Sequence, residues 1–376
     1  MPAWARQPSS TIAPAMTDAA KAPAPKLAPP SAPVAFPDVP GWAADDHAAA
    51  FSAFTASCRA TIAKSTDPDM RAVCDAALAV PPKPSSAQAR AFFEAHFAVY
   101  PAEKGDTPGL LTAYYEPVLQ GRRSPQPGFQ VPLHRRPADL VNLVDEADRA
   151  SKPTSLTHAR KTADGLQPFP TRHAIDEGAL AGQRLELFYV ADEVERFFLQ
   201  IQGSGIVDLG DGTRVRVTYD GKNGHPYTSV GRYLIDQGIM GADQMSLQAL
   251  GQWLRADANR GRHAIWQNKS YVFFREMPGA TGPIGVMGVA LTPQRSLAVD
   301  PAFHTLGLPI FVDAPAITHI TGKPFRQLMI GQDVGSAIKG RQRGDIYAGS
   351  GDKAGAIAGI TKQAGRFFVL LPKPRS

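Results

Sequence analysis

The spacing of apolar positions changes at about residue 100 of this chain. Before it, apolar and aromatic residues recur every three or four positions, which is typical of amphipathic helices. The spacing predicts helices over residues 43–62, 69–79 and 86–100. Ser86 is placed to cap the third helix, whose aromatic stripe ends at Tyr100. We interpret this stripe as core packing.

After residue 100 the apolar runs are short and many of them alternate, which is typical of strands. A polar, proline-rich stretch covers residues 121–184. The predicted strands are 109–116, 184–190, 214–219, 270–276, 285–293, 295–301, 308–312, 325–330 and 365–372. The predicted helices are 192–198, 227–236 and 247–260, with a short helix over 140–150 and a loop or hairpin over 156–165. We expect a β-rich middle domain, followed by a small barrel in the last hundred residues.

Residues 1–40 contain ten prolines, many alanines and few large apolar side chains. Such a segment buries too little apolar surface to fold, so we expect a disordered tether. Two roles stay open for it, a spacer from a membrane and a leader without function. No apolar run approaches a membrane span, and the sequence shows no signal region or lipidation cysteine.

The chain has 40 Lys and Arg against 34 Asp and Glu, so its formal net charge is 40 − 34 = +6. An excess of positive charge suits an anionic partner, such as nucleic acid, a membrane surface or an acidic polysaccharide. Nucleic acid is the weakest of the three, because no long Lys/Arg run or zinc-finger spacing is present.

Cys58 and Cys74 are the two cysteines of the chain, and both lie in the predicted N-terminal helices. They would stay thiols in the cytosol, whereas an oxidising compartment would allow a disulfide that staples a helical hairpin. Sequence does not decide between these states, since pairing depends on geometry.

Several kinds of chemistry lack their sequence signatures. The nine histidines form no metal-binding motif, and no nucleotide-binding spacing is present. Ser204, between two glycines, lacks the spacing of a nucleophile elbow. Acid catalysis on a glycosidic bond remains, with Asp333 or Asp345 in a glycine-rich stretch as the acid. The alternative is that both aspartates cap ordinary turns.

Five motifs then occur in order along the chain. They are Leu111-Thr112-Ala113-Tyr114-Tyr115-Glu116-Pro117, Gln202-Gly203-Ser204-Gly205, Asn223-Gly224-His225-Pro226-Tyr227, Leu291-Thr292-Pro293-Gln294-Arg295-Ser296-Leu297-Ala298-Val299-Asp300, and the stretch from Asp333 to Gly351. With these motifs the chain resembles the membrane-bound lytic murein transglycosylase A family, which has a C-terminal three-aspartate (3D) domain. The resemblance covers roughly residues 85–372.

The resemblance implies a mainly β fold with a helical N-terminal part. Residues 41–128 and 277–376 would form a double-psi β-barrel catalytic domain, interrupted by a β-rich insert over residues 129–276. Murein strands would lie in the groove between the two domains.

The resemblance also implies an activity. It is the non-hydrolytic cleavage of the β-1,4 bond from N-acetylmuramic acid to N-acetylglucosamine, leaving a 1,6-anhydromuramoyl end, as a lytic exotransglycosylase performs it. The family's three aspartates correspond to Asp300, Asp333 and Asp345, and the catalytic acid corresponds to Asp345. We expect Asp333 to raise the pKa of Asp345, and Lys339 and Tyr347 to support the pair.

Hydroxyls, amides and aromatic faces suit sugars, which gives a set of expected substrate-binding residues. They are Tyr114, Tyr115, Glu116, Gln200, Gln202, Ser204, Tyr227, Met287 and Ser336. Ordinary strand packing or turn formation is the alternative for several of them, Tyr115 and Gln200 included. No metal and no cofactor is expected.

The expected partners are peptidoglycan strands, with murein synthases or scaffold proteins as further candidates. The expected location is the periplasm at the outer membrane, with any membrane contact through a lipid anchor. Two other functions stay open. One is a glycoside hydrolase that pairs Asp345 with Asp333 or Glu116. The other is a murein-binding protein without catalysis.

Overall fold

The computed structural model of the protein describes residues 32–65, 67–105, 107–144, 156–279, 282–335 and 337–374. Most of the predicted tether and the second half of the predicted helix over 140–150 therefore lie outside the described residues. The end of the predicted tether packs onto the folded protein. The backbone N–H of Val34 donates to the Val99 carbonyl at 2.9 Å, and Val39 is buried.

Three helices near the N-terminus confirm the helical spacing of the sequence. They follow the short 3-10 turns η1 (Phe36–Asp38) and η2 (Trp42–Ala44), and are α1 (His47–Lys64), α2 (Pro68–Ala79) and α3 (Ser86–His96). The predicted third helix is too long, because Phe97–Pro101 forms strand β1 and pairs with β16. The cap of α3 is Ser85, one residue earlier than predicted. A disulfide joins Cys58 on α1 to Cys74 on α2.

The first sheet has the strand order β1-β16-β13-β14-β12-β15-β2, and β2 also pairs with β16. Its strands after β1 are β2 (Gly109–Glu116), β12 (Ser296–Val299), β13 (Pro309–Ala314), β14 (Phe325–Asp333), β15 (Arg343–Ser350) and β16 (Lys362–Pro372). Six strands thus form a closed ring of pairings, in which both parallel and antiparallel neighbours occur. One hydrophobic core joins the ring to the N-terminal helices.

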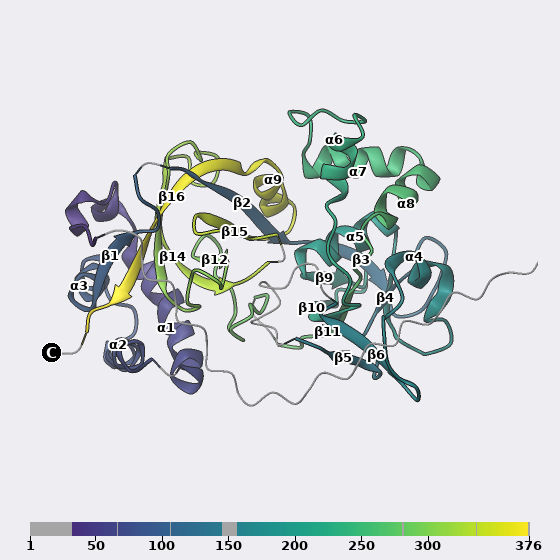
Figure 1. Cartoon of the computed structure of the whole chain (residues 1–376), viewed down its shortest axis with the longest axis horizontal. Coiled ribbons are helices and arrows are strands. Elements are labelled where there is room, and N and C mark those ends of the chain that lie inside the picture. Colours follow the sequence, from purple (N-terminus) through teal and green to yellow (C-terminus); the bar gives the residue numbers. More distant parts are fainter. Residues whose placement is uncertain are drawn as a thin grey trace, which may run out of the picture.

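The middle of the chain forms a second body, drawn beside the first in Figure 1. It has a six-stranded sheet in the order β11-β10-β9-β3-β8-β4 and a three-stranded sheet β5-β6-β7. The strands are β3 (Val118–Arg122), β4 (Val131–His134), β5 (Leu140–Asn142), β6 (His158–Thr162), β7 (Gly165–Gln167), β8 (Glu186–Val190), β9 (Ser204–Asp208), β10 (Arg214–Lys222) and β11 (Val272–Glu276). The helices are α4 (Arg172–Ala174), the π-helical turn η4 (Ile175–Ala179), α5 (Glu193–Gln202), α6 (Val230–Asp236), α7 (Leu247–Ala256) and α8 (Ala258–Trp266).

The chain passes from the first body to the second at Pro117, between β2 and β3. The predicted boundary at residue 128 differs, because it leaves β3 with the catalytic domain, whereas β3 pairs with β9 and β8 of the second body. The return to the first body falls between β11 and β12.

Two predicted elements differ in the structure, and one helix was not predicted. Residues 285–293 form a loop with one isolated bridge, Ile284 to Ala290, instead of a strand. The predicted helix over 140–150 begins as strand β5. Helix α9 (Asp352–Ile360) follows β15 and packs on β2, although its glycines gave no helical signal. No helix among the described residues is long and apolar enough to cross a membrane.

Candidate active site

Both candidate acids flank the same residue of the first sheet. Strand β12 lies between β14 and β15, and its Ala298 is the register partner of Asp333 on one side and of Asp345 on the other. Two strand spacings therefore separate the two aspartates, which is about 10 Å between their Cα atoms. Thr112 on β2 continues the row on the far side of Asp345. Neither aspartate sits in a turn, so the alternative of two turn caps is wrong.

The register between β12 and β14 shifts by one residue just before this row, between Leu297 and Ala298. A shift of this kind changes the face to which the following side chain points. The buried side chain of Ala298 is small, so it leaves space between the carboxyl groups that flank it.

Asp345 is a part-buried carboxyl whose Oδ1 accepts a short hydrogen bond from the Thr112 hydroxyl. Burial raises the pKa of Asp345, while the Thr112 hydrogen bond and the Arg343 guanidinium act in the opposite direction. A raised pKa keeps a larger fraction of the group protonated near neutral pH, as a general acid requires. Thr112 is the partner of Asp345 across the parallel pair β15 and β2.

Asp333 uses both of its carboxyl oxygens in hydrogen bonds. The Tyr114 hydroxyl donates to Oδ2 at 2.9 Å, and the Val286 backbone N–H donates to Oδ1 at 3.2 Å. Burial raises the pKa of Asp333 to about 6, and the charge of Asp345 contributes in the same direction. Burial of the Tyr114 hydroxyl and its contact with Asp333 raise the pKa of Tyr114 well above its usual range. The hydroxyl therefore keeps its proton and stays a hydrogen-bond donor.

A chain of side-chain contacts links the row of Asp333, Asp345 and Thr112 to an ion pair that joins the two bodies. The ring of Tyr114 lies 5.4 Å from that of Tyr347, whose hydroxyl is 3.2 Å from the Ser350 hydroxyl. Ser350 donates to Oε2 of Glu116 at 2.6 Å, and Arg216 of β10 donates to both Glu116 oxygens at 2.6 and 3.0 Å. Burial raises the pKa of Tyr347 to about 12. Tyr347 thus packs beside Tyr114, the donor to Asp333.

The third predicted aspartate, Asp300, directly follows β12 and binds backbone groups. It accepts hydrogen bonds from the Gly340 N–H at 2.8 Å and from the Ala302 N–H at 3.1 Å. The Gly340 bond ties Asp300 to the loop between β14 and β15, which leads into the strand of Asp345, and the Ala302 bond holds the turn after β12. Lys339 is a largely exposed residue whose charge interacts with that of Asp300. Partial loss of solvent lowers the pKa of Lys339, and the charge of Asp300 acts in the opposite direction.

Two of the predicted sugar-binding side chains are buried in structural contacts. Glu116 has no exposed surface and holds Arg216. Gln200 is 5% exposed; it accepts from Arg172 at 2.5 Å and donates to the Val272 carbonyl at 3.0 Å. Their geometry supports a role in holding the fold rather than a contact with sugar.

The remaining predicted binding residues lie at different places. Ser204 is also buried, at the start of β9, and Gln202 accepts from the Tyr115 backbone N–H at 3.1 Å. Tyr115 points to the opposite face of β2 from Tyr114, as successive strand residues do. Part-buried Met287 neighbours Val286, the donor to Asp333, and Tyr227 is part-buried before α6. Ser336 lies outside the described residues.

Thr112, Arg216 and the Val286 backbone are site groups that the sequence analysis did not select. Thr112 carried a signal, because it alternates with Tyr114 on one strand face. Nothing in the sequence linked Glu116 to Arg216, its partner 100 residues later. No group of His, Cys, Asp and Glu within the described ranges is arranged to hold a metal ion.

Two family matches cover most of the folded chain. Residues 110–275 match the MltA specific insert domain, and residues 295–371 match the 3D domain. The membrane-bound lytic murein transglycosylase A of Vibrio cholerae is 33% identical over 286 residues, which cover 73% of this chain and 70% of that protein.

Solved structures give the same result. The crystal structure of the membrane-bound lytic murein transglycosylase from Agrobacterium tumefaciens is 36% identical, with a TM-score of 0.82 over 90% of this chain and 97% of that one. The crystal structure of Escherichia coli MltA with bound chitohexaose is 29% identical, with a TM-score of 0.68 over 93% of this chain and 96% of that one. The row of acids, the insert and these matches agree: the chain belongs to the MltA family, the membrane-bound lytic murein transglycosylases A.

Proposed function

We propose that this protein is a peptidoglycan lytic transglycosylase that uses Asp345 as its catalytic acid and base. The observation that carries the assignment is the partly buried Asp345 carboxyl, which has a raised pKa and lies in one row with Thr112 and Asp333. Membership in the MltA family supports the substrate and the reaction class.

Asp345 is better placed than Asp333 to act as the proton donor. Both oxygens of Asp333 accept hydrogen bonds from protein groups, whereas the Thr112 bond occupies Oδ1 of Asp345. We therefore assign the transferable proton to Oδ2 of Asp345. Thr112 fixes the orientation of the carboxyl group, which proton transfer at hydrogen-bond distance requires.

The reaction proceeds in two steps. Asp345 gives its proton to the bridging oxygen as the bond between this oxygen and C1 of N-acetylmuramic acid breaks, and an oxocarbenium-like sugar develops. The C6 hydroxyl of the same sugar then forms the new bond to C1, and its proton returns to Asp345. The products are a free 4-hydroxyl on N-acetylglucosamine and a 1,6-anhydro end. No water is consumed.

Asp333 acts on Asp345 through charge in this proposal. The interaction between two neighbouring carboxyls is reciprocal, so the charge that raises the pKa of Asp333 also opposes ionisation of Asp345. The hydrogen bonds from Tyr114 and Val286 hold Asp333 in place. Tyr347 supports Tyr114 through ring packing, and Asp300 supports the loop before β15.

We further propose that the closed ring of six strands is a double-psi β-barrel and that residues from Pro117 to about 276 form the insert. Glycan strands would lie between the two bodies, across the row of acids. The relative with bound chitohexaose supports binding of a glycan chain at this fold. The membrane-bound relatives support a location at a membrane, and the periplasmic side of the outer membrane stays a prediction. Association with murein synthases or scaffold proteins stays a prediction.

The mass of the products tests the reaction class. Digestion of purified peptidoglycan should release fragments whose muramic acid ends weigh one water less than reducing ends, as read by mass spectrometry. A muramidase digest of the same material provides the hydrolytic reference. Fragments with reducing ends alone would contradict the proposal and favour a two-carboxylate hydrolase. The strand spacing puts about 10 Å between the Cα atoms of Asp333 and Asp345. This separation does not rule out a two-carboxylate hydrolase, so the product masses decide between the two reactions.

The pH dependence tests the role of Asp333. Cleavage requires protonated Asp345, so the rate should fall as the pH rises through the pKa of this group. Asp333→Asn removes a neighbouring negative charge, which lowers the pKa of Asp345. We expect the alkaline limb of the pH–rate profile to move to lower pH, and the maximal rate to fall less than in Asp345→Asn. An unchanged limb would contradict the role of Asp333.

A further inference from the structure

A cavity of about 450 Å³ lies on the opposite side of β2 from Asp345, between helix α9 and the helices α5 and α7 of the second body. Thr112 and Tyr114 face the acids, while Tyr115 faces this cavity. Its wall consists of residues from β2, the crossing to β3 and the three helices. They are Tyr115, Pro117, Val118, Leu119, Glu195, Phe198, Leu247, Gln248, Gly251, Gln252, Arg255, Asp352, Gly355 and Ala356.

Two glycines let aromatic rings of the cavity wall pack closely against helix backbone. A Cβ at Gly355 of α9 would lie 2.9 Å from the ring of Tyr115, and one at Gly251 of α7 would lie 3.1 Å from the ring of Phe198. Each ring therefore rests against helix backbone at a distance that a larger residue would not allow. The two aromatic faces form apolar walls, and the volume lies within the range of roughly 300–1,000 Å³ that is usual for small-ligand sites.

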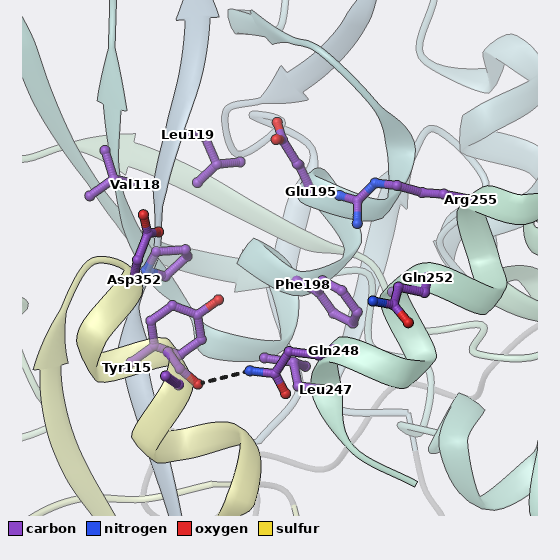
Figure 2. Close-up of a pocket in the computed structure, with 14 residues that line it drawn as sticks. Tyr115, Val118, Leu119, Glu195, Phe198, Leu247, Gln248, Gln252, Arg255 and Asp352 are labelled. Carbon is purple, nitrogen blue, oxygen red and sulfur yellow. Dashed lines mark hydrogen bonds between the residues drawn. The ribbon is translucent and has the colours of Figure 1, made fainter. Parts of the chain in front are cut away.

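An acidic and a basic side chain, Glu195 and Arg255, both line the cavity. Oε2 of Glu195 is buried and has no hydrogen-bond partner among the described residues. Arg255 binds Asp192 through Nε at 2.7 Å and Nη2 at 3.4 Å, while its Nη1 lies along the wall near Gly251. In Figure 2 the guanidinium of Arg255 lies beside the Glu195 side chain. Burial raises the pKa of Glu195, and the charge of Arg255 lowers it.

Amide groups line the neighbouring wall. Gln248 and Gln252 are four residues apart on α7, so their side chains lie on the same helix face. Figure 2 shows the Gln252 amide near Phe198 and the Gln248 amide on the side of Tyr115, where it donates to the Gly355 carbonyl at 3.5 Å. The Glu195 carboxylate is part-buried and its Oε2 has no hydrogen-bond partner, which is costly, and an ammonium group beside the carboxylate would offset that cost. A neutral sugar would supply no such charge, so the pair favours a ligand with an amine and a carboxylate close together.

We propose that this cavity binds the zwitterionic end of a short peptide, with its ammonium on Glu195 and its carboxylate on Arg255. This inference rests on the proposed function, because the polymer that the enzyme cleaves carries short peptides. The cavity faces away from the acids, so the bound peptide belongs to another part of the polymer than the bond being cleaved. The site would hold the enzyme on peptide-bearing strands.

Titration calorimetry with a free murein tripeptide tests the proposal. The tripeptide ends in diaminopimelate, whose side chain carries an amine and a carboxylate on one carbon. We expect saturable binding to the full chain, and about tenfold weaker binding to Glu195→Gln, which loses a charged hydrogen bond. Ala356→Trp, at an exposed lining residue of α9, should fill the cavity and abolish binding. The analogous peptide with lysine, which lacks the second carboxylate, should bind more weakly.

Glu177→Gln is the matched control, because it makes the same chemical change at an exposed residue of the second body and should bind the peptide as the unchanged protein does. No saturable binding by the unchanged protein, or equal affinity in Glu195→Gln, would overturn the proposal. Circular dichroism checks that each variant is folded, and Glu195→Gln decides the result if Ala356→Trp is not. The tripeptide has no glycosidic bond, so its binding and the cleavage of glycan can fail separately.

Discussion

The substitution Asp345→Asn is expected to reduce cleavage of peptidoglycan by about 10²–10⁴-fold, the usual contribution of a positioned acid and base. Asparagine has nearly the same shape and its side-chain oxygen can still accept the Thr112 hydrogen bond. It cannot transfer the proton to the leaving oxygen. The fold should therefore be retained, and binding of glycan strands should persist. Release of anhydro-muropeptides from purified sacculi measures the rate, and thermal unfolding checks the fold.

Asp75→Asn provides the control for this experiment. Asp75 is an exposed residue of α2, far along the chain from the acids, and its substitution makes the same chemical change. Its cleavage rate should match that of the unchanged protein. Anhydro products from Asp345→Asn at a similar rate would show that another group is the acid.

Arg216→Met is expected to destabilise the protein by about 3–5 kcal/mol, the usual cost of leaving a buried charge unpaired. Glu116 has no exposed surface, and Arg216 contacts both of its oxygens. Methionine fills much of the volume of the Arg216 side chain but carries no positive charge. The buried Glu116 carboxylate then keeps its hydrogen bond from Ser350 and loses its ion pair. Because Glu116 lies on β2 and Arg216 on β10, the change also removes a tie between the two bodies. Urea unfolding measures the loss of stability.

Arg214→Met is a matched control on the same strand. Arg214 pairs with Asp208, but its side chain is 64% exposed, so solvent screens this pair and it contributes little to stability. The double variant Arg216→Met with Glu116→Leu should recover part of the loss, since it leaves no buried charge. If Arg216→Met cost no more than Arg214→Met, the pair would not hold the bodies together.

Elements with regular local spacing were predictable from the sequence. The apolar faces of α1 and α2 repeat every three or four residues, and β2 and β10 alternate. Phe97 was not predictable as a strand residue, because it continues the aromatic pattern of α3. It joins β1 through pairing with Pro372 of β16, a contact that no local pattern reveals. Tertiary pairing decided its conformation.

The candidate acids were predictable, but most of their surroundings were not. Motifs pointed to Asp345 and Asp333, and strand alternation placed Tyr114 on the face of Thr112. Glu116 was predicted to bind sugar because it lies at the end of a strand, where a polar side chain can contact a ligand. Its partners Arg216 and Ser350 are 100 and 234 residues away in the sequence. Contacts over such separations depend on how the two bodies meet.

The closed ring of strands has a consequence for the order of folding. Thr112 and Asp345 are 233 residues apart, and β2 completes its pairings only with β15 and β16. Pairings between distant segments form slowly, because the intervening chain loses entropy before the contact stabilises it. The second body can shorten that distance by folding first, but the acid cannot meet Thr112 until synthesis has passed residue 345. An enzyme that cuts the wall of its own cell thus becomes active only after these distant segments have paired.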